Sequence, residues 1–187
     1  MRRGFKAESE RRAEAARASL GLGALAKLDP WDYAAFLGAH VVGADELDLP
    51  PLHAAQLLEH DSGSWSGMTL AEDDVLMIVL NSAHSRRRQA STLMHELAHS
   101  ILDHTPANVQ VSPTGLVLLS DYSDEQEEEA DWLGGALLLP QVVLYHHRSR
   151  GRSISDIARD FGVSEDLCHW RCRMTGIEKR MAFRSRA

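Results

Sequence analysis

Two histidines on one amphipathic segment place the strongest constraint on how this chain folds. Between residues 88 and 102, apolar side chains recur every three or four positions, which predicts a helix with one buried face. The run His95-Glu96-Leu97-Ala98-His99 lies inside this helix. The segment must therefore pack on a core and still present two imidazoles one turn apart. The apolar positions are Ala90, Leu93, Met94, Leu97, Ala98 and Ile101.

The spacing of these histidines suits a metal ion. Side chains at positions i and i+4 of a helix project from one face about 6 Å apart along the axis, so both imidazoles can bind one tetrahedral zinc ion. Glu96 points about 100° away from His95 around the helix, where it can act as general base on a water without binding the ion. A His-Glu-x-x-His pattern also arises by chance, and the histidines are then ordinary surface or core residues.

A catalytic zinc ion needs a third protein ligand, and the acidic run 125–131 offers the best candidate. In the helix that we expect over residues 124–139, Glu127 and Asp131 lie one turn apart. Glu127 is expected to bind the ion while Asp131 accepts a hydrogen bond from a ligand imidazole. Most of this acidic cluster also fits a solvated helix start, which the helix dipole favours.

Three other residues stay open as ligands. Glu128 and Glu129 follow Glu127 directly, and His104 lies five positions beyond His99. His104 reaches the ion only if its helix ends early, so a place at the surface or beside the ligands suits it better.

The remaining pattern predicts a mainly helical α+β fold. Val75 to Leu80 is apolar throughout, as in a strand buried on both faces. The Gly- and Ser-rich segment 62–74 indicates an irregular strand before it, so we expect a small antiparallel sheet. Further short strands are expected at 41–42 and 116–119, and helices at 4–20, 30–38, 52–60, 88–102 and 124–139.

The C-terminal 40 residues differ from the rest in charge. Residues 148–187 hold ten basic and five acidic side chains, whereas the whole chain carries a net charge of −7. The segments 154–164 and 167–176 predict a helix, a tight turn and a second helix, which is similar to a helix-turn-helix. We therefore expect one domain over 1–147 and a small basic helical appendage over 148–187. DNA contact through Arg171 and Arg173 is the weaker hypothesis for it, and packing on the domain is the stronger one.

Composition excludes several classes of protein. A hydrophobic fraction of 44% with 25% charged residues argues against wholesale disorder. Cys168 and Cys172, the two cysteines, lie one helical turn apart and cannot easily form a disulfide, so a secreted disulfide framework is excluded and buried thiols are expected. The first residues lack an apolar signal core, and no apolar run approaches the roughly 20 residues of a membrane span. We expect a cytoplasmic protein.

Several motifs together resemble the ImmA/IrrE family of metallo-endopeptidases. The resemblance covers nearly the whole chain. It departs from the family pattern at Gly134-Gly135, where larger apolar residues are usual, and at Asp131, where the family has asparagine. The matching segments are Leu28-Asp29-Pro30, Ser66-Gly67-Met68-Thr69, Val75 to Asn81, Arg88-Gln89, Met94 to His99, and Glu127-x-Glu129-Ala130-Asp131 leading to Leu137-Leu138-Leu139-Pro140.

This resemblance implies a zincin-like metallopeptidase domain over residues 1–147. It implies zinc, with manganese as an in vivo alternative, on His95, His99 and the glutamate matching Glu127, with Glu96 as catalytic base. Its substrate class would be a helix-turn-helix transcriptional repressor, whose cleavage induces mobile-element or stress-response genes.

Two further points stay open. Substrate is expected to add as a strand along residues 65–70 or 75–80, and Tyr122, Tyr145 and His146 are candidates for stabilising the oxyanion. The alternative function is a metal-dependent regulatory protein that binds a repressor, or less plausibly DNA, without cutting.

Overall fold

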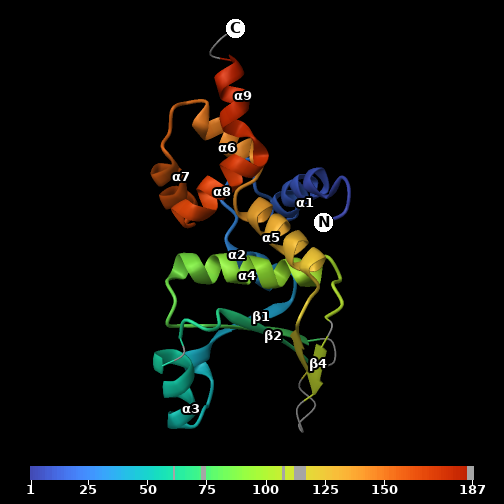
Figure 1. Cartoon of the computed structure of the whole chain (residues 1–187), viewed down its shortest axis with the longest axis vertical. Coiled ribbons are helices and arrows are strands. Elements are labelled where there is room, and N and C mark those ends of the chain that lie inside the picture. Colours follow the sequence, from blue (N-terminus) through green and yellow to red (C-terminus); the bar gives the residue numbers. More distant parts are fainter. Residues whose placement is uncertain (61, 73–74, 107, 112–116, 185–187) are drawn as a thin grey trace.

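A mixed five-stranded sheet forms one layer of the molecule, and helices cover one of its faces (Figure 1). The computed structural model describes residues 1–60, 62–72, 75–106, 108–111 and 117–184. The strand order is β1-β3-β2-β5-β4. The strands are β1 (Ala39–Gly43), β2 (Gly67–Glu72), β3 (Val75–Leu80), β4 (Asn108–Val111) and β5 (Val117–Ser120).

The mainly helical α+β class is confirmed, but the sheet is not purely antiparallel. β1 runs parallel to β3, while the β2–β3, β2–β5 and β4–β5 pairs are antiparallel. The parallel pair arises because the chain reverses twice between β1 and β3, and β3 then inserts between β1 and β2. The expectation of a substrate strand along 65–70 or 75–80 is wrong for most of that length, since β2 and β3 are both inner strands.

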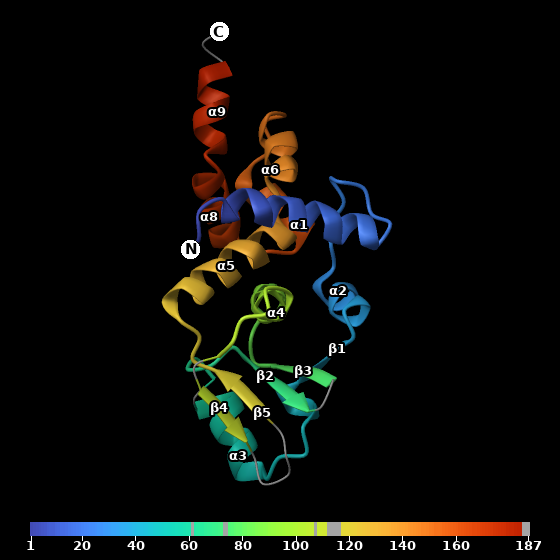
Figure 2. The same ribbon diagram turned by 90° about the vertical axis from the view of Figure 1, so that its right-hand side faces the viewer.

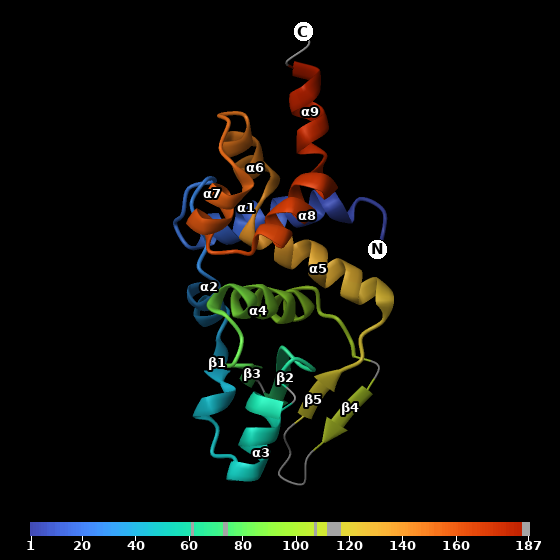
Figure 3. The ribbon, with the colours of Figure 1, turned by 60° about the vertical axis from the view of Figure 1, so that its left-hand side comes forward.

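Helix α4 (Arg86–Ile101) lies across the covered face of the sheet and carries the two histidines (Figures 1 and 2). Ser85 caps its first turn by accepting a hydrogen bond from the Arg88 backbone N–H. The predicted apolar stripe is confirmed, because Ala90, Leu93, Met94, Leu97 and Ala98 are all buried. Helix α4 therefore packs between the sheet on one side and α5 (Asp124–Leu138) on the other (Figure 3).

Helix α5 (Asp124–Leu138) crosses over α4 and makes the largest helix–helix contact in the described residues. Figure 3 shows the crossing from the side, with α4 between α5 and the sheet. At the crossing a side chain on Gly134 would place its Cβ 3.1 Å from the Met94 carbonyl oxygen and 3.3 Å from the His95 nitrogen. A side chain on Gly135 would meet the Trp170 ring at 2.8 Å. The glycines at 134 and 135, where larger apolar residues are usual in the family, therefore have a packing reason. They let α4 and the C-terminal helices approach the backbone of α5.

Two buried arginines fix the far end of α5. Arg17, on α1 (Phe5–Ser19), donates to the carbonyl oxygens of Ala13, Ala26 and Leu137. Arg171 donates to the Leu139 carbonyl and to Glu10 of α1. Both guanidinium groups are almost fully buried. Removing their charges from water costs free energy, and these hydrogen bonds offset part of that cost.

In the C-terminal segment, all the regular secondary structure up to residue 184 is helical. The predicted helix-turn-helix pair is confirmed as α7 (Ile154–Phe161) and α8 (Glu165–Thr175), joined at Gly162, whose φ of 69° suits glycine. Two helices were not expected, α6 (Gln141–Arg148) and α9 (Ile177–Arg184). Cys168 and Cys172 are buried thiols, as expected. The division of the chain at residue 147 stays a prediction.

The smaller elements complete the frame. Helix α2 (Pro30–Phe36) starts at the Asp29 cap, as expected, and packs on α4 and β1. The stretch expected as one helix at 52–60 begins as α3 (Pro51–Ala55) and continues as a π-helix at Gln56–His60. None of the helices in the described ranges has the length and apolar character needed to cross a bilayer.

The α4–α5 crossing makes a stability prediction. Gly134→Val should lower the free energy of unfolding by about 1–3 kcal/mol, because its side chain overlaps the α4 backbone. Gly23→Val is the matched control, since a Cβ at Gly23 meets nothing within 4 Å. Urea denaturation of both variants measures the difference. Equal midpoints for the two would contradict the close approach.

Candidate active site

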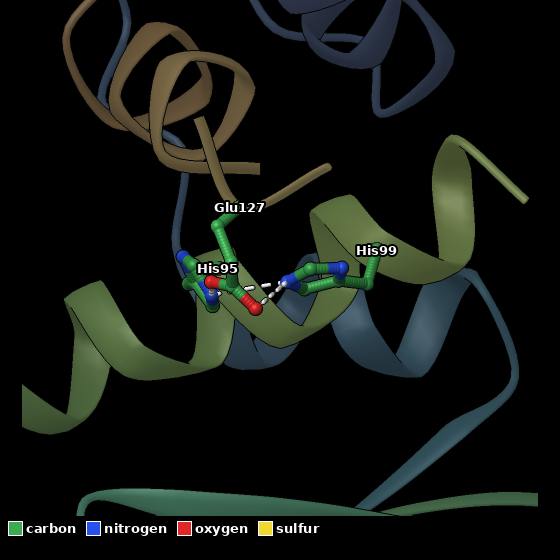
Figure 4. A group of neighbouring side chains, drawn as sticks. All are labelled: His95, His99 and Glu127. Carbon is green, nitrogen blue, oxygen red and sulfur yellow. Dashed lines mark hydrogen bonds and ion pairs between the residues drawn. The ribbon is translucent and has the colours of Figure 1, made fainter. Parts of the chain in front are cut away.

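His95 and His99 project from α4 toward α5, as the spacing predicted (Figure 4). Their Nε2 atoms lie 3.0 Å apart and face the same point. The two rings differ in exposure, since the His95 side chain is 26% exposed and that of His99 only 2%. The pair is thus open to a ligand on the His95 side and closed behind His99.

Glu127 reaches over both rings from the start of α5 (Figure 4). Its carboxylate oxygens lie 3.1 Å from His95 Nε2 and 3.7 Å from His99 Nε2. Ligand atoms of a tetrahedral zinc ion, each about 2.0–2.1 Å from the metal, are separated by about 3.3 Å. The three distances of 3.0, 3.1 and 3.7 Å bracket that value, so these residues fit a divalent metal ion.

The other candidate ligands point elsewhere. Glu128 faces the backbone amine of Met1 at 2.9 Å, and Glu129 is buried next to His104 and Arg2. His104 Nδ1 lies 3.0 Å from His99 Nδ1, on the side of that ring away from the ligand atoms. Burial lowers the pKa of His104, so its imidazole is neutral near pH 7. Geometry thus singles out Glu127 among the glutamates.

Asp131 holds the second nitrogen of His95. Its Oδ1 lies 3.0 Å from His95 Nδ1, which favours a proton on Nδ1 and leaves the Nε2 lone pair for a metal. Burial is the largest single influence and disfavours a charge on His95, but the hydrogen bond to Asp131 and the nearby charges of Asp131, Glu96 and Glu127 together outweigh it and raise the pKa of His95. Burial lowers the pKa of His99 to about 3, so this ring is neutral and able to bind a metal.

Glu96 follows the ligand candidate His95 on α4 and accepts a hydrogen bond of 2.5 Å from the Thr69 hydroxyl of β2. Burial raises its pKa, and the Thr69 hydrogen bond opposes that rise. His95, Glu96 and Asp131 also line a cleft of about 370 Å³, which gives a substrate access to the carboxylate. A carboxylate with a raised pKa is suited to accept a proton near neutral pH.

Tyr122 is the one of the three oxyanion candidates that lies at this site. Its ring stacks on the His99 ring with centroids 3.7 Å apart, and burial raises its pKa to about 12. It therefore stays protonated and can donate a hydrogen bond. Tyr145 and His146 belong to α6, which packs on α8 and α9 instead.

Thr69 is the residue that sequence reasoning missed as part of this site. It is 2% exposed on an inner strand and points at Glu96. A polar side chain on the inward face of a strand is a sequence signal for a functional residue. The partner of Thr69, however, lies 27 positions away, and the contact depends on how α4 packs on the sheet.

The two arginines of α8 in the DNA hypothesis, Arg171 and Arg173, differ in exposure. Arg171 is fully buried against Glu10, and Trp170 packs edge-on against Trp132. The start of α8 instead exposes Glu165 and Asp166, whose charges repel phosphates. Arg173, the other arginine of the DNA hypothesis, is exposed, and DNA contact through it stays a prediction.

A helix-borne histidine pair with a glutamate from a crossing helix defines a candidate metal centre of the metallopeptidase type. The chain matches the IrrE N-terminal-like domain, Peptidase_M78, over residues 53–173, and it belongs to this peptidase family. The matched range runs from α3 to α8 and includes all three candidate ligands. A search of curated proteins found no match.

The contact between Thr69 and Glu96 makes a prediction about pKa. Thr69→Val keeps the side-chain shape but removes the hydroxyl that stabilises the charged carboxylate, so the pKa of Glu96 should rise in the metal-free protein. Carbon-13 NMR titration of the Glu96 carboxyl measures it. Thr69→Ser, which retains a hydroxyl, should titrate close to wild type, and an unchanged value in Thr69→Val would refute the contact.

Proposed function

We propose that this protein is a zinc-dependent endopeptidase in which His95, His99 and Glu127 hold the metal and Glu96 is the catalytic base. The observation that carries the proposal is the position of Glu96. It lies one residue from a ligand, outside the ligand set, and lines the cleft that reaches the site. A purely structural metal site has no use for a carboxylate there.

Each residue has a separate task in peptide hydrolysis. His95, His99 and Glu127 would hold a divalent ion, which would lower the pKa of a water molecule and polarise the scissile carbonyl. Glu96 takes the proton of the attacking water and delivers it to the leaving amine. Asp131 keeps His95 in the tautomer that leaves Nε2 free. Tyr122 is the side chain that donates to the developing oxyanion, since it is protonated and packs on His99.

The proposed substrate is a helix-turn-helix transcriptional repressor, and its cleavage would induce the genes that it silences. Membership of the IrrE-type peptidase family supports a protein substrate of this class. We propose a cytoplasmic location, where such a repressor acts, and zinc as the metal with manganese as its in vivo alternative. Both metals accept imidazole and carboxylate ligands.

The decisive experiment compares wild type with Glu96→Gln on the repressor encoded beside the gene, with zinc or manganese added. Loss of the base should reduce cleavage by about 10²–10⁴-fold while zinc still binds, because Glu96 is outside the ligand set. Cleavage is followed by mass spectrometry of the fragments and zinc by its stoichiometry. Equal cleavage by both proteins would remove Glu96 from the mechanism.

The same experiment tests the alternative. If the repressor remains intact but leaves its operator when the wild-type protein is added, the chain is a regulatory binder and not a peptidase. Glu127→Ala is the companion variant, and it should lose both zinc and cleavage, since it removes one of three ligands.

A further inference from the structure

His99 has a second contact on the side away from the metal site that the proposed mechanism does not use. Its Nδ1 faces His104 Nδ1 at 3.0 Å, and His104 Nε2 faces Glu129 Oε2 at 3.6 Å. His104 and Glu129 are nearly buried, with side chains 7% and 8% exposed. The three groups form a row that leads from the metal site into the interior.

The geometry allows two arrangements of protons along this row. The two Nδ1 atoms share one hydrogen bond, so one ring must donate and the other accept. If His99 donates, its Nε2 is free for a metal, and His104 carries its own proton on Nε2, facing the carboxylate. If His104 donates, the His99 proton moves to Nε2 and blocks the metal, while a lone pair of His104 faces the carboxylate.

The carboxylate of Glu129 discriminates between these arrangements. Its distance of 3.6 Å from His104 Nε2 exceeds an ordinary hydrogen bond, but a charge in a buried setting still attracts an N–H and repels a lone pair. Glu129 is itself held in place, because its Oε1 accepts a hydrogen bond of 3.0 Å from the Arg2 backbone N–H. It therefore favours the arrangement in which His99 can bind a metal.

We propose that Glu129, acting through His104, is a positioning pair that keeps His99 in its metal-binding tautomer. The inference rests on the metal site of the proposed function. It gives the two histidine ligands parallel support: Asp131 holds His95 directly, and Glu129 holds His99 through one intervening ring. Asp131 is exposed, whereas the support for His99 is buried.

The test is Glu129→Gln. The Arg2 backbone N–H and its guanidinium both face Oε1, so the amide oxygen should take that place and turn the NH₂ group toward His104. An N–H in that position favours the arrangement that blocks His99. Zinc affinity, measured by competition with a chromophoric chelator, should fall by about 10–100-fold. Glu128→Gln is the matched control, since it makes the same change one residue away, where the contact is with Met1, and should stay within about twofold of wild type.

Nitrogen-15 NMR of the His99 ring in the metal-free protein separates positioning from a merely structural role. Wild type should carry its proton on Nδ1, and Glu129→Gln should move it toward Nε2. A second pair of variants tests the intervening ring: His104→Leu should lose zinc affinity, and His104→Asn, whose amide oxygen can accept from His99 Nδ1, should recover most of it.

The outcomes are distinct. The positioning pair is refuted if Glu129→Gln binds zinc as tightly as Glu128→Gln, or binds it weakly with the tautomer of His99 unchanged. If the wild-type protein itself binds no zinc, and His95→Ala changes nothing, the metal site of the proposed function fails instead.

Discussion

The close crossing of α4 and α5 at Gly134 is the constraint on which the site depends. A side chain there would place its Cβ 3.1 Å from the Met94 carbonyl, directly beside the backbone of His95. Without a Cβ, α5 lies close enough for Glu127, two turns earlier, to reach both imidazoles. The contact is backbone against backbone, so no flexible side chain can adjust to a larger residue. The same crossing brings Asp131 to His95 and Glu129 to His104.

The rest of the structure holds this crossing in place. The strands β2 and β3 contact α4 from below, and Thr69 of β2 reaches Glu96 from that side. From above, Arg17 and Arg171 bind the carbonyl oxygens of Leu137 and Leu139, where α5 ends. Buried guanidinium groups tolerate little misplacement, because a lost hydrogen bond leaves a charge unpaired in the interior. The helices α1 and α8 thus support α5 although neither supplies a metal ligand.

Much of the fold was predicted from the periodicity of the sequence, and the predictions that were wrong have physical causes. The apolar run Val75–Leu80 predicted β3 at its observed bounds, and Ser123 and Ser164 capped helices near the expected positions. The helix α6 follows Pro140 with only two residues between it and α5, and it was missed because a proline that ends one helix also opens the next. The parallel β1–β3 pair was missed because strand direction depends on the path of the connection, which local pattern does not record.

The sequence by itself determined the chemistry of the site. His95 and His99 at i and i+4, Glu96 between them and Glu127 with Asp131 one turn apart were all predicted from spacing within single helices, because helical geometry is local. Only the tertiary structure decided which glutamate faces the histidines, where His104 points and what holds Glu96. The contacts of Glu127 and Glu129 form only where α5 crosses α4, and the contact of Thr69 with Glu96, 27 positions apart, forms only where α4 packs on β2.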